Sequence, residues 1–267
     1  MTTEVFAPAK VNLSLHVTGQ RSDGYHLLDS LVVFADVGDR LWLTPAPQMK
    51  ITISGPFAPG VPVDDRNLVW RAAQLAGWCG HIMLEKNLPH GAGIGGGSAD
   101  AAAVLRSLGG GCQAASLGAD VPVCLSSAPQ RMSGTGEILA TVTGIPALEI
   151  VLVNPGVSVP TAPVFAALQS KTNAPMTADL PRWADAQEFC KWLSFQRNDL
   201  EPPARTIAPG ITEVLQALDG ALLARMSGSG ATCFGLYAQG ASAQAARIAA
   251  VHPDWWVVSG RVISSDG

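Results

Sequence analysis

Hydrophobic and polar residues alternate strictly along "KVNLSLHV", residues 10–17. Successive side chains of a strand point to opposite faces, so this pattern predicts a half-buried strand with one polar face. The apolar face carries Val11, Leu13, Leu15 and Val17, and the polar face carries Lys10, Asn12, Ser14 and His16. The dipeptide Asp23-Gly24 follows in "RSDGYH" and favours a tight turn before the next strand.

Further along the chain, the pattern predicts strands and helices in mixed order. Two strands flanking a Val-Gly-Asp turn are expected over 27–46, and single strands over 49–55, 81–86, 136–142, 148–156 and 255–263. Helices are expected over 67–78, 99–108, 160–168, 184–195, 211–220 and 241–251. A short helix or turn running into a strand is expected over 114–125, and a strand–loop–strand over 221–238.

These elements do not alternate as regular strand–helix pairs, which predicts the α+β class. The pattern fades around residues 143–147, a candidate boundary in a chain of 267 residues. We therefore expect an N-terminal domain over 1–146 and a C-terminal domain over 147–267. Hydrophobic residues make up 48% of the chain, which is a globular composition.

Charge and cysteine usage narrow the class of protein. Only 14% of residues are charged, the net charge is −4, and no basic run occurs, which disfavours nucleic acid or an anionic membrane as a partner. No apolar signal core or spanning segment is evident, so a cytoplasmic location is expected. The five cysteines form no CxxC pair and are expected to be buried free thiols.

The segment "PHGAGIGGGSADAAAVLRSL", residues 89–108, places five glycines between Gly91 and Gly97, before a predicted helix. It satisfies GxGxxG, but a proline-containing segment separates it from the preceding strand, and the acidic residue expected after a second strand is missing. The Walker form GxxxxGK[ST] also fails, because Gly97 stands where lysine is required.

Two interpretations of these glycines remain. One is a flexible surface loop. The other is a phosphate cradle, in which backbone N–H groups turn inward and the helix opened by Ser98 presents its N-terminus to an anion.

Residues 89–102 resemble the second motif of the galactokinase, homoserine, mevalonate and phosphomevalonate kinase (GHMP) superfamily, P-x-x-x-G-[LI]-G-[SG]-[SG]-S-A. Residues 6–32, "FAPAKVNLSLHVTGQRSDGYHLLDSLV", more narrowly resemble the opening of the 4-diphosphocytidyl-2-C-methyl-D-erythritol kinase family. "LGADVPVCL", "NPGVSVPTAPVF" and "MSGSGATCFG" resemble further blocks in the same order, so nearly the whole chain is covered. The resemblance implies a ribosomal-protein-S5-domain-2-like N-terminal domain, a ferredoxin-like C-terminal domain and an active site in the interdomain cleft.

The implied reaction transfers the γ-phosphoryl group of ATP, with Mg²⁺, to the 2-hydroxyl of the methylerythritol unit in non-mevalonate isoprenoid synthesis. Asp120 matches the family's catalytic base, and Lys10 matches its lysine, a cation that offsets charge on the moving phosphoryl group. By themselves, an aspartate two residues before Pro122 also fits a turn or cap, and Lys10 fits a solvated strand lysine. No carboxylate cage for the metal is visible, and Mg²⁺ commonly uses waters and substrate oxygens.

The resemblance also assigns binding residues. Asn12 matches a substrate-contacting asparagine, Tyr25 and His26 the pair that stacks on and hydrogen-bonds cytosine, Phe165 the aromatic on the other face of the base, and Thr161 a nearby polar contact. Tyr25 and Phe165 also fit core or hairpin packing. The expected nucleotide-binding residues are Asn67, Lys86, Pro89, His90, Gly91, Ala92, Gly93, Ile94, Gly95, Gly96, Gly97, Ser98 and Ala99.

Three features complete the comparison with the family. Residues 109–116, "GGGCQAAS", replace a longer helical segment. Asp100 stands where the family more often has a neutral residue, and because a carboxylate would repel phosphate we expect it to point away. The second glycine loop, Ser227–Thr232, is expected to lie beside the first and to help close the phosphate site.

We therefore expect a kinase for a small molecule that carries cytidine diphosphate, as a monomer or weak homodimer. Another GHMP-type kinase, acting on homoserine or mevalonate, is an alternative, although those substrates lack a base for Tyr25, His26 and Phe165. A non-catalytic ligand-binding regulator is a second alternative, which the presence of Lys10 and Asp120 disfavours.

Overall fold

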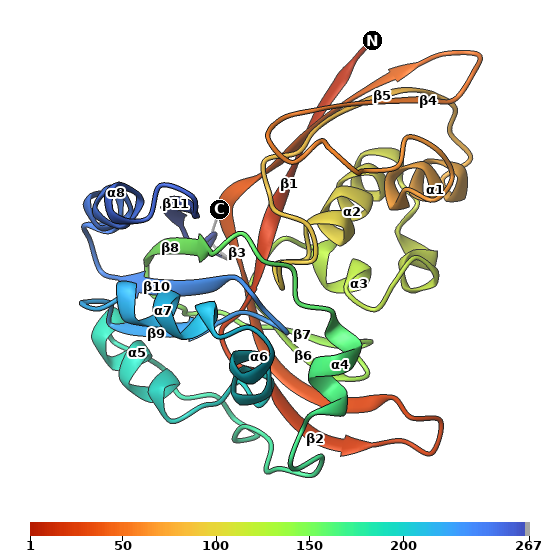
Figure 1. Cartoon of the computed structure of the whole chain (residues 1–267). Coiled ribbons are helices and arrows are strands. Elements are labelled where there is room, and N and C mark those ends of the chain that lie inside the picture. Colours follow the sequence, from red (N-terminus) through yellow and green to blue (C-terminus); the bar gives the residue numbers. More distant parts are fainter. Residues whose placement is uncertain (265–267) are drawn as a thin grey trace. The chain divides into compact units, whose positions relative to one another are not determined.

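The computed structural model describes residues 1–264 and divides the chain into two compact units. The first unit comprises Met1–Lys10, Gly38–His90 and Gly95–Ser127. The second comprises Val11–Val37, Gly91–Ile94 and the chain from Ala128 onward. Both units combine strands and helices, so the expected α+β class is confirmed (Figure 1). The expected boundary at 146/147 stays a prediction.

In the first unit, a sheet carries three helices. Strand β4 (Lys50–Ser54) pairs parallel with β5 (Gly80–Glu85), which pairs antiparallel with residues 40–45 of β3 (His26–Pro45); β1 (Thr3–Asn12) also pairs with β3. Helices α1 (Leu68–Leu75), α2 (Gly96–Leu108) and α3 (Val121–Cys124) lie side by side, with a short 3₁₀ turn over Gly111–Ser116 (Figure 1).

Helix α2 occupies the interior of this unit. Its residues from Ala99 to Leu105 are all buried, and most are alanine, so neighbouring helices can approach closely. Gly109 ends the helix in the left-handed conformation, and its N–H bonds the carbonyl of Leu105. The chain therefore uses small side chains to bring the first turn of α2 next to β1 and α1 without a bulky core.

In the second unit, four antiparallel strands lie in the order β11-β8-β10-β9. They are β8 (Glu149–Asn154), β9 (Leu223–Met226), β10 (Cys233–Tyr237) and β11 (Trp256–Arg261). The helices are α4 (Thr161–Ala166), α5 (Ala186–Ser194), α6 (Glu201–Ile207), α7 (Gly210–Ala217) and α8 (Ala241–Val251). Apolar residues of α7, α8 and the strands share one buried cluster.

The second unit also contains a set of hairpins. Strand β2 (His16–Gln20) pairs antiparallel with the start of β3 across the expected tight turn, where Gly24 has a φ of 91°. Residues 28–32 of β3 pair with β6 (Gln130–Gly134), and β6 pairs with β7 (Ile138–Thr141). The turn places Tyr25 and His26 at the beginning of β3.

The structure corrects the expectation for residues 10–17. They do not form one strand, because β1 ends at Asn12 and β2 begins at His16. Their polar side chains are buried as well as their apolar ones, with Ser14 0% and His16 1% exposed. The cause is a distant segment, since Leu15 donates its N–H to the carbonyl of Arg197 and Ser14 Oγ donates to Met176 Sδ.

The expected Val-Gly-Asp turn is also wrong, because β3 continues through it as one strand of 20 residues. A side chain at Gly38 would collide with the carbonyl oxygen of Ala7, so this glycine permits a close approach by β1 rather than a turn. The expected strand near 121–125 is helix α3, which tolerates Pro122 in its first turn. Strand β6 and helix α6 were not predicted.

The five cysteines are free thiols, but only three are buried. Cys79 and Cys112 are exposed, which corrects the expectation that all five would be interior. The remaining expected helices and strands are present, with ends shifted by a few residues.

Candidate functional site

The first unit brings together two residues expected from the sequence. Lys10 Nζ lies 2.7 Å from Asp120 Oδ2, although 110 residues separate them in the chain. Lys10 lies near the end of β1 and is 4% exposed, whereas the side chain of Asp120, which precedes α3, is 41% exposed. A buried cation thus holds a carboxylate that remains open to solvent. This arrangement excludes the interpretation of Lys10 as a solvated lysine.

The first glycine loop has a regular backbone. Gly91, Gly93 and Gly95 have φ of 56°, 76° and 63°, so every second residue is left-handed. Left-handed residues at alternate positions are typical of anion-binding nests, in which successive N–H groups turn toward one side. A Cβ at Gly95 would lie 3.3 Å from the side chain of Lys10, so this end of the loop runs along the lysine stem.

Helix α2 begins at Gly96, earlier than expected, and Gly95 is its N-cap. Ser98 is therefore the third residue of the helix rather than its first. The first N–H groups of a helix have no partner within it, and here they belong to two glycines and a serine. The geometry fits a phosphate cradle and does not fit a loosely structured surface loop.

The middle of this loop, Gly91–Ile94, belongs to the second unit, where it lies against the second glycine loop. Ser227 Oγ donates a hydrogen bond of 2.9 Å to the carbonyl of Gly93, and Thr232 N–H donates one of 3.1 Å to the carbonyl of Ala92. A side chain at Gly93 would collide with the carbonyl of Ser227. The expectation that the second loop lies beside the first is confirmed for these residues.

Asn12, at the end of β1, is also held by the second glycine loop. Its backbone N–H donates to Ser227 Oγ at 3.1 Å, and its Nδ2 donates to Ser30 Oγ at 2.8 Å. Its Oδ1 is buried and has no hydrogen-bond partner among the described residues. A buried acceptor without a partner is costly, so this atom is poised to accept a hydrogen bond from a ligand.

The residues expected to bind a base gather in the second unit. The rings of His26 and Phe165 stack, with centroids 4.7 Å apart and an interplanar angle of 26°. Tyr25 is 65% exposed, which excludes a role in the core, whereas Phe165 is partly buried and also packs against the apolar cluster of the unit. Thr161 Oγ1 lies 3.0 Å from Ser229 Oγ, which links the start of α4 to the second glycine loop.

His26 retains unused hydrogen-bonding capacity. Its Nε2 is buried and has no partner within residues 1–264. Burial lowers the pKa of His26, and the positive charge of Lys171 lowers it further. A neutral imidazole has one donor and one acceptor nitrogen, as recognition of a polar base edge requires.

Two of the expected nucleotide-binding residues, Asn67 and Lys86, already use their polar atoms within the first unit. Asn67 caps α1, accepting from Val69 N–H at 2.9 Å and donating to the carbonyl of Pro62 at 2.8 Å. Lys86 is 3% exposed and ion-paired. A nucleotide contact through either side chain stays a prediction. Of the neighbouring expected residues, Pro89, Ala92, Ile94 and Ala99 are buried, and the ring of His90 contacts the carbonyl of Phe57.

The partners of Lys86 form a buried cluster that sequence reasoning missed. Lys86 Nζ lies 2.7 Å from Asp100 Oδ2 and also bonds Asp39, whose other oxygen accepts the N–H groups of Asn87 and Leu88. Burial alone would lower the pKa of Lys86, but attraction to Asp100 and Asp39 outweighs it, and the net shift is upward. The cluster ties β3 to the segment before the glycine loop and to the first turns of α2.

The carboxylate of Asp100 accepts a hydrogen bond from Lys86 in this cluster. The expectation that Asp100 points away from a bound phosphate stays a prediction. Burial raises the pKa of Asp100 to about 8, with Lys86 opposing the shift and Asp39 adding to it. The sequence pattern could not reveal the cluster, because Asp39 and Asp100 lie 47 and 14 residues from Lys86 in the chain.

Residues 1–264 contain no group of three or more His, Cys, Asp or Glu side chains that could hold a metal ion. No helix in the same part of the chain is long and apolar enough to cross a membrane.

Comparison with known proteins gives consistent matches along the chain. The GHMP kinases N-terminal domain model matches residues 67–120, and the GHMP kinases C-terminal model matches residues 176–251. Two curated relatives are named 4-diphosphocytidyl-2-C-methyl-D-erythritol kinase. The one from Dinoroseobacter shibae is 58% identical, covering 94% of this chain and 92% of its own, and the one from Paracoccus denitrificans is 57% identical, covering 95% and 94%.

Solved structures of kinases also match this chain. A crystal structure of 4-(cytidine 5'-diphospho)-2C-methyl-D-erythritol kinase matches with a TM-score of 0.77 and 35% identity, covering 97% of this chain and 99% of its own. A homoserine kinase from Cytophaga hutchinsonii matches with a TM-score of 0.67 and 21% identity, covering 98% and 95%, which shows the shared fold. The chain belongs to the 4-diphosphocytidyl-2-C-methyl-D-erythritol kinase family of the GHMP kinases.

Proposed function

We propose that the protein transfers the γ-phosphoryl group of Mg-ATP to the 2-hydroxyl of 4-diphosphocytidyl-2-C-methyl-D-erythritol, a step in isoprenoid precursor synthesis. One observation carries the proposed chemistry: the buried Lys10 holds the solvent-accessible carboxylate of Asp120 at 2.7 Å, and the same lysine stem runs along Gly95 of the glycine loop. Curated relatives of up to 58% identity that carry this kinase name support the choice of substrate.

In this proposal Asp120 accepts the proton of the attacking hydroxyl. The hydroxyl oxygen forms a bond to the γ-phosphorus, the bond to the bridging oxygen breaks, and ADP leaves. Lys10 offsets negative charge on the transferred group, and the N–H groups of Gly91–Ser98 orient the phosphates. Positioning and charge supply most of the rate in phosphoryl transfer, so few reactive side chains are needed. Magnesium would arrive with the nucleotide, bound mainly by phosphate oxygens and water.

The second unit supports a substrate that carries a base. The unpartnered Nε2 of His26, beside its stack with Phe165, offers a hydrogen bond to the edge of cytosine, and the exposed ring of Tyr25 offers a stacking face. Asn12 Oδ1 offers an acceptor for a further polar group of the substrate. Homoserine and mevalonate have no base, so these residues disfavour them as substrates. We also propose a cytoplasmic location, which the free thiols support.

A coupled assay of ADP release tests the proposal. Purified protein with Mg-ATP should turn over 4-diphosphocytidyl-2-C-methyl-D-erythritol and leave homoserine and mevalonate unphosphorylated. Turnover of mevalonate or homoserine in preference would favour another GHMP-type activity. Absence of turnover on all three would favour a ligand-binding regulator and contradict the proposal.

The variant Asp120→Asn tests the proposed base. It should lower kcat by about 10²- to 10⁴-fold, the range for removal of a general base. Asp64→Asn is a matched control, because Asp64 is also ion-paired at 2.7 Å and its side chain is 45% exposed. The control should keep wild-type kcat. Near-wild-type kcat in Asp120→Asn would remove Asp120 from its assigned role.

A further inference from the structure

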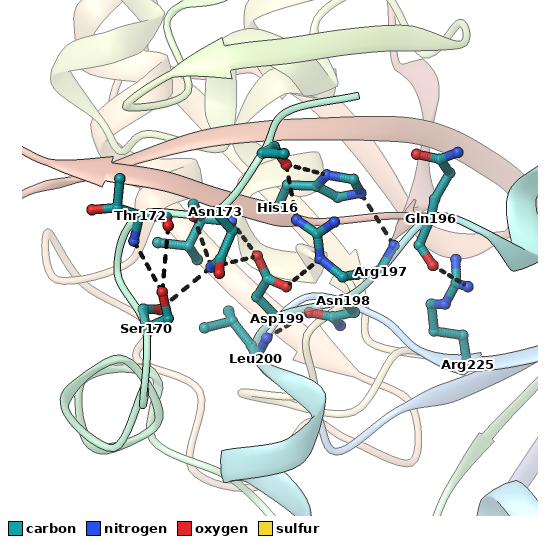
Figure 2. Close-up of polar contacts among 12 residues, drawn as sticks. His16, Ser170, Thr172, Asn173, Gln196, Arg197, Asn198, Asp199, Leu200 and Arg225 are labelled. Carbon is teal, nitrogen blue, oxygen red and sulfur yellow. Dashed lines mark hydrogen bonds and ion pairs between the residues drawn. The ribbon is translucent and has the colours of Figure 1, made fainter. Parts of the chain in front are cut away.

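The segment Gln196–Leu200 lies along the chain between β1 and β2 in the second unit (Figure 2). Leu15 N–H donates to the carbonyl of Arg197 at 2.7 Å, and Asp199 N–H donates to the carbonyl of Leu15 at 2.8 Å. Asp199 Oδ2 also accepts the N–H of Val17 at 2.8 Å. Backbone and side-chain bonds together therefore fix the position of this segment.

Asn198, in the middle of the segment, turns its side chain to the second glycine loop. Its Nδ2 donates to the carbonyls of Met226 and Gly228, each at 2.8 Å, and its Oδ1 accepts the N–H of Leu200 at 3.0 Å. The residue is 6% exposed. Both amide hydrogens are thus used on two carbonyls that flank Ser227.

Ser227 connects the second glycine loop to the first glycine loop and to Asn12. Its Oγ donates to the carbonyl of Gly93 at 2.9 Å and accepts the N–H of Asn12 at 3.1 Å. A Cβ at Gly228 would lie 2.9 Å from the same carbonyl of Gly93, so the two loops are in direct contact. A shift of the Met226–Gly230 loop would therefore displace both Gly93 and Asn12.

We propose that Asn198 is a positioning residue for phosphoryl transfer, because it holds the Met226–Gly230 loop in the place that fixes Gly93 and Asn12. The inference rests on the proposed function, in which Gly93 belongs to the phosphate cradle and Asn12 to the substrate site. Asn198 acts through Ser227, because its own side-chain hydrogen bonds go to Met226, Gly228 and Leu200. Its loss should impair the chemical step more than binding of the cytidine-bearing substrate, because Tyr25, His26 and Phe165 have no bond to it.

Asn173 provides a matched control in the same region (Figure 2). Its Nδ2 donates to the carbonyl of Val17 and to Asp199 Oδ2, both at 3.1 Å. Asn173 thus stabilises the contact between β2 and the segment Gln196–Leu200. The side-chain hydrogen bonds of Asn173 go to Val17, Ser170 and Asp199, and none of them reaches residues 226–230. A purely structural contribution of Asn198 should therefore resemble that of Asn173.

The first experiment compares Asn198→Asp with Asn173→Asp in steady-state kinetics and thermal unfolding. Aspartate keeps the acceptor for Leu200 but loses both donors and faces two carbonyls. We expect kcat of Asn198→Asp to fall by about 10²-fold, the effect of a displacement of roughly 1 Å at a reacting centre. KM for the cytidine-bearing substrate should change much less, because Asn12 is only one of the proposed contacts to that substrate. Asn173→Asp should lower the unfolding temperature and keep kcat. Equal kcat losses that follow the unfolding temperature would overturn the proposal.

The second experiment is amide hydrogen exchange on the free protein, which needs no turnover. Asn198→Asp should speed exchange in peptides that cover 226–232 and 91–94, and Asn173→Asp should leave both as in the wild type. Unchanged exchange at 91–94 in Asn198→Asp would overturn the inference whatever the kinetics show. Faster exchange there, in a protein whose wild type lacks turnover, would instead overturn the proposed function. If Asn198→Asp does not fold, Asn198→Ala carries the same expectations without the added charge.

Discussion

The buried cluster around Lys86 leads to a prediction about pH and stability. One cation faces two carboxylates, Asp39 and Asp100, so the cluster has one negative charge in excess when both are ionised. Asp100 is 2% exposed, and its Oδ1 has no partner among the described residues. Burial accordingly raises the pKa of Asp100 from 3.8 to about 8. The perturbation that we choose is Asp100→Asn, which keeps the shape and an acceptor oxygen for Lys86.

The sign and size of the effect follow from proton linkage. A raised pKa means that the folded protein holds a proton that the unfolded chain releases. The resulting stabilisation is complete below pH 3.8 and is lost as the pH rises through about 8. Within that window each pH unit removes about 1.4 kcal/mol of unfolding free energy. The asparagine variant does not titrate, so between about pH 5 and pH 7 it should gain on the wild type by about 1.4 kcal/mol per unit and level off above about pH 9.

Urea unfolding at each pH unit from 5 to 9 measures this difference. Asp64→Asn is the control: the hydrogen bond from Arg66 lowers the pKa of Asp64 to about 2, so its titration lies below the measured range. The difference between that variant and the wild type should not depend on pH. A difference between Asp100→Asn and the wild type that is also constant from pH 5 to 9 would refute the assignment of a raised pKa to Asp100.

Three further predictions concern other parts of the chain. Gly38→Ala should destabilise the protein by about 1–3 kcal/mol in urea unfolding, because its Cβ would collide with Ala7; an unchanged midpoint would contradict this reason. Burial lowers the pKa of His16 below 6.5, and its Nε2 accepts the N–H of Arg197. The wild type should therefore lose stability as the pH falls below 6.5, whereas the variant His16→Gln should not. Parallel curves of stability against pH for the two proteins would show that His16 does not titrate in this way. Tyr25→Ala should raise KM for the cytidine-bearing substrate far more than KM for ATP, and equal increases would argue against base stacking.

Local patterns in the sequence predicted local structure well. The turn at Gly24, the helix that follows Asn67 and the helix after the glycine loop each depend on residues within a few positions of one another. The continuity of β3 could not be predicted, because Gly38 is needed for the approach of Ala7 and not for a turn. For Gly38 and for residues 10–17, the deciding contact came from a segment distant in sequence.

In the candidate site, too, local features could be predicted from the sequence and contacts between distant segments could not. The nest of the first glycine loop follows from glycine's freedom at positive φ, which is a local property. The pairing of Lys10 with Asp120 was reached only through resemblance to a family, since either residue alone fits an ordinary strand or turn. The cluster of Lys86 and the contacts of Asn198 have no signal in sequence spacing, because their partners lie in other elements.

The glycines of the two loops permit close backbone contact between the loops as well as positive φ angles. Gly93 and Gly228 face each other's backbones at distances that exclude a side chain, and the hydroxyl of Ser227 bonds across the junction. Because side chains cannot fill that junction, buried amides must hold it, and Asn198 supplies two of the bonds. The anion site that we propose would use backbone N–H groups, with Lys10 and Asp120 as its charged side chains. The precision of such a site then depends on the residues that fix the backbone, which is why substitutions at Asn198 should affect catalysis while the loops themselves remain unaltered in sequence.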